Sequence, residues 1–382
     1  PILSMSLNRG LTMISVFGSC VGQEEIDEIR TSFEKQWLGI GLKTRSFESL
    51  FAHRLGLKDF VFLDNGSNSL YMAVKLLNLS PGSEVILPSF TWVACAHAII
   101  LAGGIPVFCD VDVNTQNVTA DTIAPHISSK TRAIMVVHYA GKPVRMEPVL
   151  SFGQPVIEDA AQAVDSKLGN KYCGSLGTIG VYSFDPVKNI TTGEGGGITT
   201  RDSELMTRAR QLRYCGIGSA GFEAAAMKER WWEYDIVDVF PKLLPNDIAA
   251  SIGLAQLRKI DKFQTIRKKI WNIYQAQLAD FDWLIRPQGP ASDEQHSYFT
   301  YSIRVAKGKR DQLAKYLYSR GIYTTVRFHP LHLNPIYKSS YRLPICEQLN
   351  DEILSLPLHP NLSDSDIDAI LLSLQKFNEQ YM

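Results

Sequence analysis

The stretch Gly180-Val-Tyr-Ser-Phe-Asp-Pro-Val-Lys-Asn-Ile-Thr-Thr-Gly-Glu-Gly-Gly-Gly197 decides how the rest of the chain is interpreted. It places Lys188 between an aromatic, β-branched run and a glycine-rich turn. Upstream, the acidic pair Glu158-Asp159 ends another apolar run. An amine held in a pocket near a carboxylate is what Schiff-base chemistry on an aldehyde cofactor requires. Because most lysines are solvated surface residues, this prediction depends on the context of Lys188 and not on the lysine alone.

Around this stretch, short apolar runs alternate with helical patterns. Such alternation predicts a mainly parallel sheet with helices on both faces, and ligands of these sheets gather at the strand ends. We therefore expect an α/β protein whose functional residues follow its strands. The predicted strands are 60–63, 84–87, 105–109, 133–137, 155–157, 181–184 and 197–200, and the predicted helices are 23–36, 47–55, 70–77 and 92–101. The first of these helices is amphipathic, with Ile26, Ile29 and Phe33 on one face.

The pattern changes from about residue 247. A long helical pattern covers 248–278 and is followed by a half-buried strand at 298–305. Further predictions are a helix at 310–319, a strand at 322–328 and a closing helix at 364–377. This order predicts a large α/β domain over residues 1–250 and a smaller α+β domain over residues 251–382.

Composition excludes several classes of protein. The 382 residues contain 39 Lys and Arg against 39 Asp and Glu, so nothing predicts electrostatic capture of nucleic acid or of an anionic membrane. Six scattered cysteines without a Cys-x-x-Cys pair argue against a zinc site of the usual spacing and against a disulfide framework. The N-terminus lacks a signal-peptide pattern, and the longest apolar stretch is too short to span a bilayer. We expect free thiols and a cytoplasmic protein.

Two further segments carry groups suited to a phosphorylated cofactor. Residues 64–69, Asp-Asn-Gly-Ser-Asn-Ser, follow a strand and open a helix, where the N–H groups of Ser67 and Asn68 could cradle a phosphate. A simple helix N-cap is the alternative. A buried carboxylate at Asp159 would need a cation, which a protonated pyridine nitrogen would supply, whereas an acidic helix cap is the alternative there.

Other residues give weaker signals. Ser183 lies five residues before Lys188, so its hydroxyl could bind the phosphate of the cofactor that the lysine holds. Trp92 follows a turn and could stack on a ring, although a core position is the alternative for a single tryptophan. His329 and His332 lie in a Pro-rich loop without nearby carboxylates or cysteines, so we predict no metal site. Residues 193–197 lack dinucleotide-fingerprint spacing.

Together these motifs resemble the DegT/DnrJ/EryC1/StrS family of sugar aminotransferases, which are pyridoxal 5'-phosphate enzymes of fold type I. The resemblance runs from about Ser15 to the C-terminus. It implies a mainly parallel seven-stranded sheet flanked by helices, plus a smaller C-terminal domain. The motifs that carry it are Asn65-Gly-Ser-Asn68, Pro88-Ser-Phe-Thr-Trp92, Ile157-Glu-Asp-Ala-Ala-Gln162, residues 183–196, Asp247-Ile-Ala-Ala-Ser-Ile-Gly-Leu-Ala-Gln-Leu257 and Pro330-Leu-His-Leu-Asn-Pro335.

The resemblance also implies residue roles. Lys188 would form the Schiff base and move the proton, Asp159 would pair with the pyridinium nitrogen, and Gln162 would lie against the ring. The implied phosphate and ring contacts are Gly66, Ser67, Asn68, Ser183 and Trp92. Members form homodimers in which a partner loop, here residues 241–246 with Lys242, completes the phosphate site. The implied substrate contacts are Asp185, His329, His332 and Tyr337.

Three positions depart from the family pattern. Residue 185 is Asp where histidine or tyrosine is commoner, Asn68 replaces a usual alanine, and Leu244 stands at the usual asparagine of the partner loop. The first departure changes a contact on the substrate side. The second alters the phosphate cradle, and the third leaves Lys242 as the phosphate ligand from that loop.

The implied reaction is a ping-pong transfer from L-glutamate to a nucleotide-linked keto sugar, as in the deoxyamino-sugar pathways of lipopolysaccharide O-antigen. Residues 191–196, Thr-Thr-Gly-Glu-Gly-Gly, resemble members that aminate C4 of a 4-keto-6-deoxy sugar. Amination at C3 stays open, although members that act there more often have Asp in place of Glu194, and Asp185 keeps a carbonyl elsewhere on an unusual sugar open. Sugar dehydration is a further alternative that Lys188 argues against, since the dehydratases carry histidine there. A non-catalytic regulator is the last alternative, although no DNA-binding segment or basic patch is present.

Overall fold

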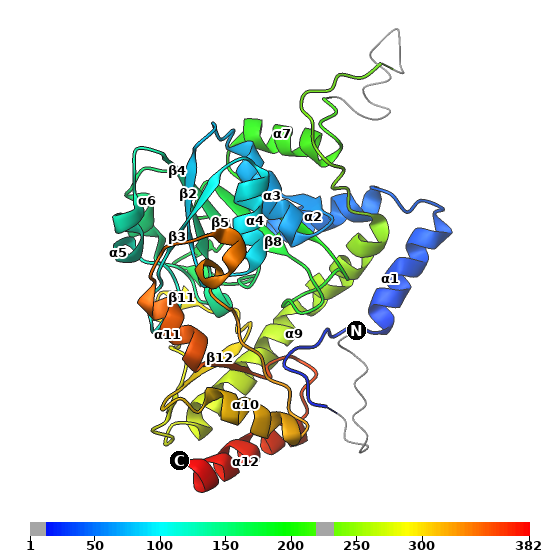
Figure 1. Cartoon of the computed structure of the whole chain (residues 1–382). Helices are drawn as coiled ribbons and strands as arrows, with labels where there is room; N and C mark the ends of the chain where they lie inside the picture. The colour runs from blue at the N-terminus through cyan, green and yellow to red at the C-terminus, as the bar shows by residue number, and fades with distance from the viewer. Residues whose placement is uncertain (1–12, 219–232) are drawn as a thin grey trace.

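The computed structural model describes residues 13–218 and 233–382 (Figure 1). Its centre is a seven-stranded sheet in the order β1-β9-β8-β5-β4-β2-β3. Strand β9 is antiparallel to both of its neighbours, and the other pairings are parallel. The predicted strands are all present to within two residues at each end, which confirms the mainly parallel sheet. The strands are β1 Val61–Leu63, β2 Glu84–Pro88, β3 Ile105–Cys109, β4 Thr131–Val137, β5 Val156–Asp159, β8 Ile179–Ser183 and β9 Gly196–Thr200.

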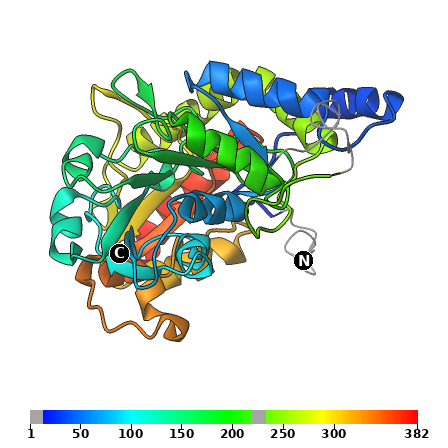
Figure 2. The ribbon, with the colours of Figure 1, turned by 90° about the horizontal axis from the view of Figure 1, so that it is seen from above.

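Helices cover both faces of this sheet (Figure 2). Alternate residues of one strand belong to different cores: Val61 packs with the helices of one face, and Phe62 joins an aromatic cluster on the other. This alternation follows from the two-residue period of a strand. The first face carries α3 Gly66–Leu76, α4 Val93–Leu101, α6 Met146–Leu150 and α7 Ser203–Arg213, and the second carries α2 Leu42–Arg54 and the start of α9 Asp247–Gln277.

A second, smaller unit is built from the C-terminal part of the chain. Its antiparallel sheet, in the order β10-β12-β13, packs against two helices around a core that includes Trp283 and Phe377. Its elements are β10 Leu284–Ile285, β12 Tyr301–Val305, β13 Ile353–Leu356, α10 Arg310–Ser319 and α12 Asp364–Tyr381. The predicted strand at 322–328 is wrong, because only isolated bridges form there, from Ile322 to Ile14 and from Thr325 to Ser355.

Short elements connect the two units. A small sheet pairs β11 Glu294–Gln295 with β6 Lys167–Leu168, and β6 with β7 Lys171–Tyr172. The remaining short elements of the described residues are α5 Ala120–Ile123, α11 Pro344–Glu352 and the 3₁₀ turns η1 Ala124–His126, η2 Tyr139–Gly141, η3 Leu331–Leu333 and η4 Pro335–Tyr337.

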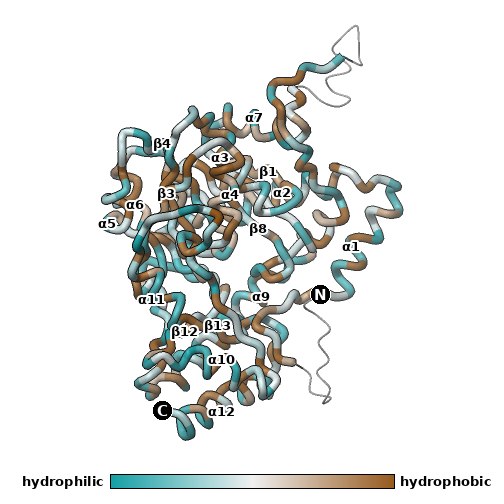
Figure 3. The backbone as a smooth tube through the Cα atoms, in the orientation of Figure 1, coloured by the Kyte–Doolittle hydropathy of each residue, from teal (hydrophilic) through white to brown (hydrophobic). Residues whose placement is uncertain are grey.

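Much of the central sheet is apolar (Figure 3). Across the described ranges, every helix is too short or too polar to cross a membrane.

Helix α9 is shared by both units. Near its start, Leu254 and Phe263 join the aromatic cluster, and towards its end Trp271 and Tyr274 join the C-terminal core. Its 31 residues begin at Asp247, and the side chain of the preceding Asn246 accepts the N–H of Ala249 at 2.9 Å, as expected of an N-cap. The predicted domain boundary at residue 250 stays a prediction, since the helix contributes to both cores.

Residues 13–20 form an N-terminal strap that spans the two units. The carbonyl of Val16 accepts the N–H of Leu358 at 3.3 Å, and Ile14 bridges to Ile322, so the strap joins the C-terminal unit. At its other end, the Ser19 hydroxyl donates to the carbonyl of Pro186, two residues before Lys188, at 2.5 Å. The start of the chain therefore lies beside the turn that carries the lysine.

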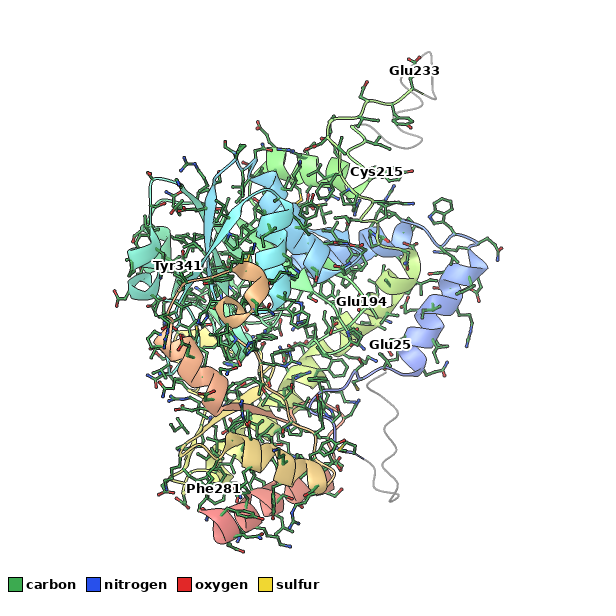
Figure 4. All side chains as sticks on the ribbon, in the orientation of Figure 1. Glu25, Glu194, Cys215, Glu233, Phe281 and Tyr341 are labelled. Carbon is green, nitrogen blue, oxygen red and sulfur yellow. The ribbon has the colours of Figure 1, made fainter. Side chains whose placement is uncertain are left out.

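Helix α1, Gln23–Glu34, exposes its apolar face. Glu25 points towards α9, where it bonds Gln256 and pairs with Lys259 (Figure 4). Ile26 is 53% exposed and Phe33 is 51% exposed. The amphipathic pattern is present, but its apolar residues do not cover the core of this chain.

Candidate active site

The predicted site residues come from strand ends at a single edge of the central sheet. Asp159 is the last residue of β5, Lys188 follows β8, and the 64–69 segment follows β1. Strands β5 and β8 are parallel, and β1 is parallel to β8 because both are antiparallel to β9. Trp92 follows β2, another parallel strand. Four segments far apart in the sequence thus meet where ligands of α/β sheets bind.

Lys188 lies at the end of a tight turn that Asp185 organises. The carbonyl of Asp185 accepts the N–H of Lys188 at 3.0 Å, and its carboxylate accepts the N–H of Val187 at 2.9 Å. The Lys188 amine lies 5.2 Å from the centre of the Phe299 ring, and it has no carboxylate within ion-pair distance in the described part of the chain. Burial is the largest cause that lowers its pKa to about 8, followed by the charge of Arg327. Such an amine is readily available as a nucleophile.

Asp159 is a buried carboxylate that receives only neutral donors. Its Oδ1 accepts the N–H of Ala161 at 2.9 Å, and its Oδ2 accepts the thiol of Cys95 at 3.3 Å. No lysine, arginine or histidine of the described ranges pairs with it. A buried carboxylate without a cation is costly, so this environment fits a ligand that brings one. The protonated ring nitrogen of pyridoxal phosphate is such a cation.

The N-terminus of α3 is close to Ser183. A Cβ at Gly66 would lie 2.7 Å from the Cβ of Ser183 and 2.8 Å from its hydroxyl oxygen, so only glycine fits there. The N-cap alternative is realised by Asn65, whose side chain accepts the N–H of Asn68 at 2.8 Å. The N–H groups of Gly66 and Ser67 lie in the first turn, beside the Ser183 hydroxyl. A phosphate fits this arrangement of donors at a helix N-terminus.

Asn68 is placed differently from the other cradle residues. Its N–H is taken by Asn65, and its side-chain amide donates to Asp64 at 2.8 Å. Both donor groups of Asn68 are therefore engaged by the protein itself. The departure from the family's alanine gives Asp64 a partner, and a phosphate contact from Asn68 stays a prediction.

Gln162 and Trp92 flank the same edge. The Gln162 side chain is buried, and its oxygen accepts the N–H of Ala140 at 2.7 Å, which fixes the turn after β4. Trp92 is 54% exposed, with its ring 5.9 Å from that of Phe328. The core alternative for Trp92 is therefore wrong, and its ring is accessible to a ligand. Contacts of either side chain with a cofactor ring stay predictions.

The predicted substrate residues after 328 lie in a loop packed on α4. His332 is buried: its Nδ1 lies 2.7 Å from the hydroxyl of Ser89, and its Nε2 lies 3.5 Å from Glu347. His329 is exposed and contacts Asn350 at 2.9 Å. In this structure His332 thus anchors the loop through both ring nitrogens.

Tyr337, from the same loop, keeps a polar group unused. Its hydroxyl is buried and has no hydrogen-bond partner within residues 13–218 and 233–382. Its ring packs 5.3 Å from Phe108. This hydroxyl could accept a substrate contact.

Within residues 13–218 and 233–382, no three His, Cys, Asp or Glu side chains gather into a group that could hold a metal ion.

Lys242 lies on the segment predicted to reach a partner subunit. It is exposed, with its amine 5.9 Å from the Tyr214 ring. The neighbouring carbonyl of Leu243 accepts the N–H of Asp64 at 3.3 Å, so this segment passes the cradle of its own chain. Which subunit's phosphate Lys242 approaches stays a prediction.

Sequence reasoning missed three side chains at this site. Cys95 donates to Asp159, and both Phe299 and Arg327 lie around Lys188. Each comes from a segment distant from its partner in the sequence, and the only signal was the presence of Arg327 near two histidines. Asp185, which the sequence did single out, lies near the same amine, and the charges of Asp159 and Asp185 oppose the lowering of the pKa of Lys188.

Comparisons with known proteins agree with this geometry. The sequence model of the DegT/DnrJ/EryC1/StrS aminotransferase family matches residues 19–375. The dTDP-4-dehydro-2,3,6-trideoxy-D-glucose 4-aminotransferase of Saccharopolyspora spinosa is 38% identical over 97% of this chain and 98% of its own length. The aminotransferase TlmJ from Streptoalloteichus hindustanus superposes with a TM-score of 0.90 at 38% identity, covering 95% of this chain and 98% of that one. The PLP form of Spr1654 from Streptococcus pneumoniae superposes with a TM-score of 0.89 at 26% identity, covering 97% and 100%.

Proposed function

The chain belongs to the DegT/DnrJ/EryC1/StrS aminotransferase family of pyridoxal-phosphate enzymes, and we propose that it transfers the amino group of L-glutamate to C4 of a nucleotide-linked 4-keto-6-deoxy sugar. The observation that carries this proposal is the pair formed by Lys188 and Asp159. A lysine with a lowered pKa and a buried carboxylate without a protein cation lie at neighbouring strand ends.

The residues present fit the cofactor. When bound, pyridoxal phosphate withdraws electrons from the carbon that carries the transferred amino group. Asp159 pairs with the ring nitrogen, and the N–H groups of Gly66 and Ser67 hold the phosphate together with the Ser183 hydroxyl. Lys188 would hold the cofactor covalently, and its amine would carry the proton that moves during the transfer. Its pKa of about 8 suits this task, because a proton-transfer group works best with a pKa near the operating pH.

The C4 position is supported by two observations. The Saccharopolyspora relative is named as a 4-aminotransferase and matches nearly the whole chain. Residues 191–196 have the pattern of members that act at C4. Asp185, which stands beside Lys188 in place of the commoner histidine or tyrosine, keeps another carbonyl as the second candidate.

We also propose a homodimer with shared active sites. Helix α1 and the residues around it expose large apolar side chains, whereas surfaces of monomers seldom carry such contiguous patches. These side chains are Val21, Ile26, Phe33, Trp37, Leu38 and Leu42. A second copy of the chain would cover them, and Lys242 would then reach the phosphate of one of the two sites.

The six cysteines are free thiols, which supports a cytoplasmic location.

Absorbance spectroscopy tests the proposal. The purified protein loaded with pyridoxal phosphate should be yellow, and L-glutamate should bleach the band. Lys188→Ala should lose turnover, and retained turnover in that variant would refute the role of the lysine.

Incubation with a dTDP-linked 4-keto-6-deoxy sugar, followed by NMR of the product, assigns the aminated carbon. A product aminated at C3 would contradict the C4 assignment alone.

A further inference from the structure

Arg327 is a buried arginine without an acidic partner. Its side chain is 8% exposed, and no carboxylate within the described residues lies in ion-pair distance of it. Its guanidinium instead faces two aromatic rings, at 4.7 Å from the centre of Phe17 and 5.0 Å from that of Phe299. A buried charge without a partner is unfavourable. Such a group is therefore expected to meet an anion that the chain does not itself provide.

The other two buried arginines of the described residues each donate to groups of the protein, although Nε of Arg267 has no partner. Arg304 pairs with Glu352 at 2.8 Å. Arg267 donates to the carbonyls of Phe299 and Leu358, at 3.2 and 3.0 Å. Since Arg327 donates to neither type of group, it differs from both. The two rings contact the guanidinium without accepting hydrogen bonds from its N–H groups, which leaves these donors for a ligand.

Arg327 and Lys188 lie close to the same aromatic ring. The Lys188 amine and the Arg327 guanidinium both lie about the Phe299 ring, at 5.2 and 5.0 Å from its centre. The charge of Arg327 contributes to the lowered pKa of Lys188. Burial lowers the pKa of Arg327, and the charge of Asp185, which forms no ion pair with it, opposes that shift. Two cationic side chains therefore lie about the same aromatic ring.

We propose that Arg327 binds a carboxylate of the amino-acid donor. This inference rests on the proposed function, because it names the group of the donor that the site recognises. A guanidinium edge matches a carboxylate with two parallel hydrogen bonds, and an amino acid carries its carboxylate within a few bonds of its amine. The cofactor phosphate already has its donors at the N-terminus of α3 and at Ser183. The keto sugar carries no carboxylate, and its charged groups lie beyond the anomeric carbon, away from the reacting one.

The donor half-reaction tests this proposal directly. Rapid mixing of the yellow holoenzyme with L-glutamate should give a Kd at least tenfold higher in Arg327→Gln, with partial recovery in Arg327→Lys. The KM of the sugar nucleotide should stay within about twofold. L-Alanine has only the α-carboxylate, so it distinguishes between the two carboxylates of glutamate. An equal loss of affinity for both amino acids places Arg327 at the α-carboxylate. A loss confined to glutamate places it at the side-chain carboxylate.

A second binding measurement and a control variant test the same assignment. Calorimetric titration of glutarate, a dicarboxylate without an amine, into the apoprotein should show binding that Arg327→Gln loses; this readout holds even if the wild-type cofactor never reacts with glutamate. Arg304→Gln is the matched control, since it alters a buried arginine that already has its partner, and its glutamate Kd should match the wild type. An unchanged glutamate Kd in a folded Arg327→Gln variant would overturn the proposal. So would a rise in the sugar-nucleotide KM as large as the change for glutamate.

Discussion

Replacing Glu158 with glutamine should destabilise the protein strongly while leaving the chemistry of Asp159 in place. Glu158 is fully buried, and each of its oxygens accepts two hydrogen bonds. Oε1 accepts the N–H groups of Leu176 and Gly177, at 2.7 and 2.5 Å. Oε2 accepts the N–H of Gly174 at 2.8 Å and lies 2.9 Å from Nε2 of His138. The glutamate thus fixes the turn that precedes β8.

The size of the effect follows from counting acceptors. Glutamine keeps one oxygen, which still accepts hydrogen bonds from two of the four donors. Its NH₂ group replaces the other oxygen and cannot accept hydrogen bonds from the remaining two donors. His138 cannot become an acceptor at Nε2, because its Nδ1 already accepts the N–H of Val144 at 3.0 Å. Two buried donors lose their acceptor, each at a cost of about 1–3 kcal/mol. We therefore expect Glu158→Gln to lower the free energy of unfolding by about 2–6 kcal/mol.

Urea denaturation at fixed protomer concentration measures this change, because the stability of an oligomer depends on concentration. Glu147→Gln is the control: that carboxylate is exposed in α6, and its loss should change stability by less than about 0.5 kcal/mol. A loss below about 1 kcal/mol in Glu158→Gln would refute the acceptor count on which the reasoning rests.

Three other predictions concern the site and the surface. Reconstitution of the apoprotein with pyridoxal phosphate should accelerate as pH rises through about 8, where the Lys188 amine loses its proton; a midpoint near 10.5, the ordinary lysine value, would contradict the burial of this amine. Gly66→Ala should weaken cofactor binding at least tenfold in equilibrium dialysis, because its Cβ would overlap Ser183, whereas Gly22→Ala adds a methyl group in open space and should bind normally. Phe33→Glu should shift the protein towards the monomer in analytical ultracentrifugation, and an unchanged mass would contradict a dimer interface at this helix.

The sequence was sufficient for the sheet and for placing Lys188 and Asp159 at neighbouring strand ends. Parallel strands buried on both faces appear as continuous apolar runs, and this is why strands such as β4 and β5 were predicted. Polar residues that end such runs, here Asp159, indicate the functional edge. The predicted strand at 322–328 failed because its apolar residues pack as an irregular segment, with single bridges at Ile322 and Thr325.

Other features depend on contacts between distant segments. The apolar period of α1 was correct, yet a period does not tell whether the apolar face covers its own core or another molecule, and Ile26 faces outwards. Cys95 reaches Asp159 across 64 residues of sequence, and Arg327 reaches Phe17 across a longer separation. No local pattern marks such pairs, because they arise only when the sheet and the C-terminal unit are assembled.

The N-terminal strap has a consequence for synthesis on the ribosome. The strap is made before its partners Ile322 and Leu358, which lie far downstream in the sequence. Phe17, which packs on Arg327, can take its place only after both partners have left the exit tunnel. A nascent chain therefore cannot complete the surroundings of Arg327 until residue 358 has emerged, and products that end before residue 322 lack Arg327 and both anchors of the strap.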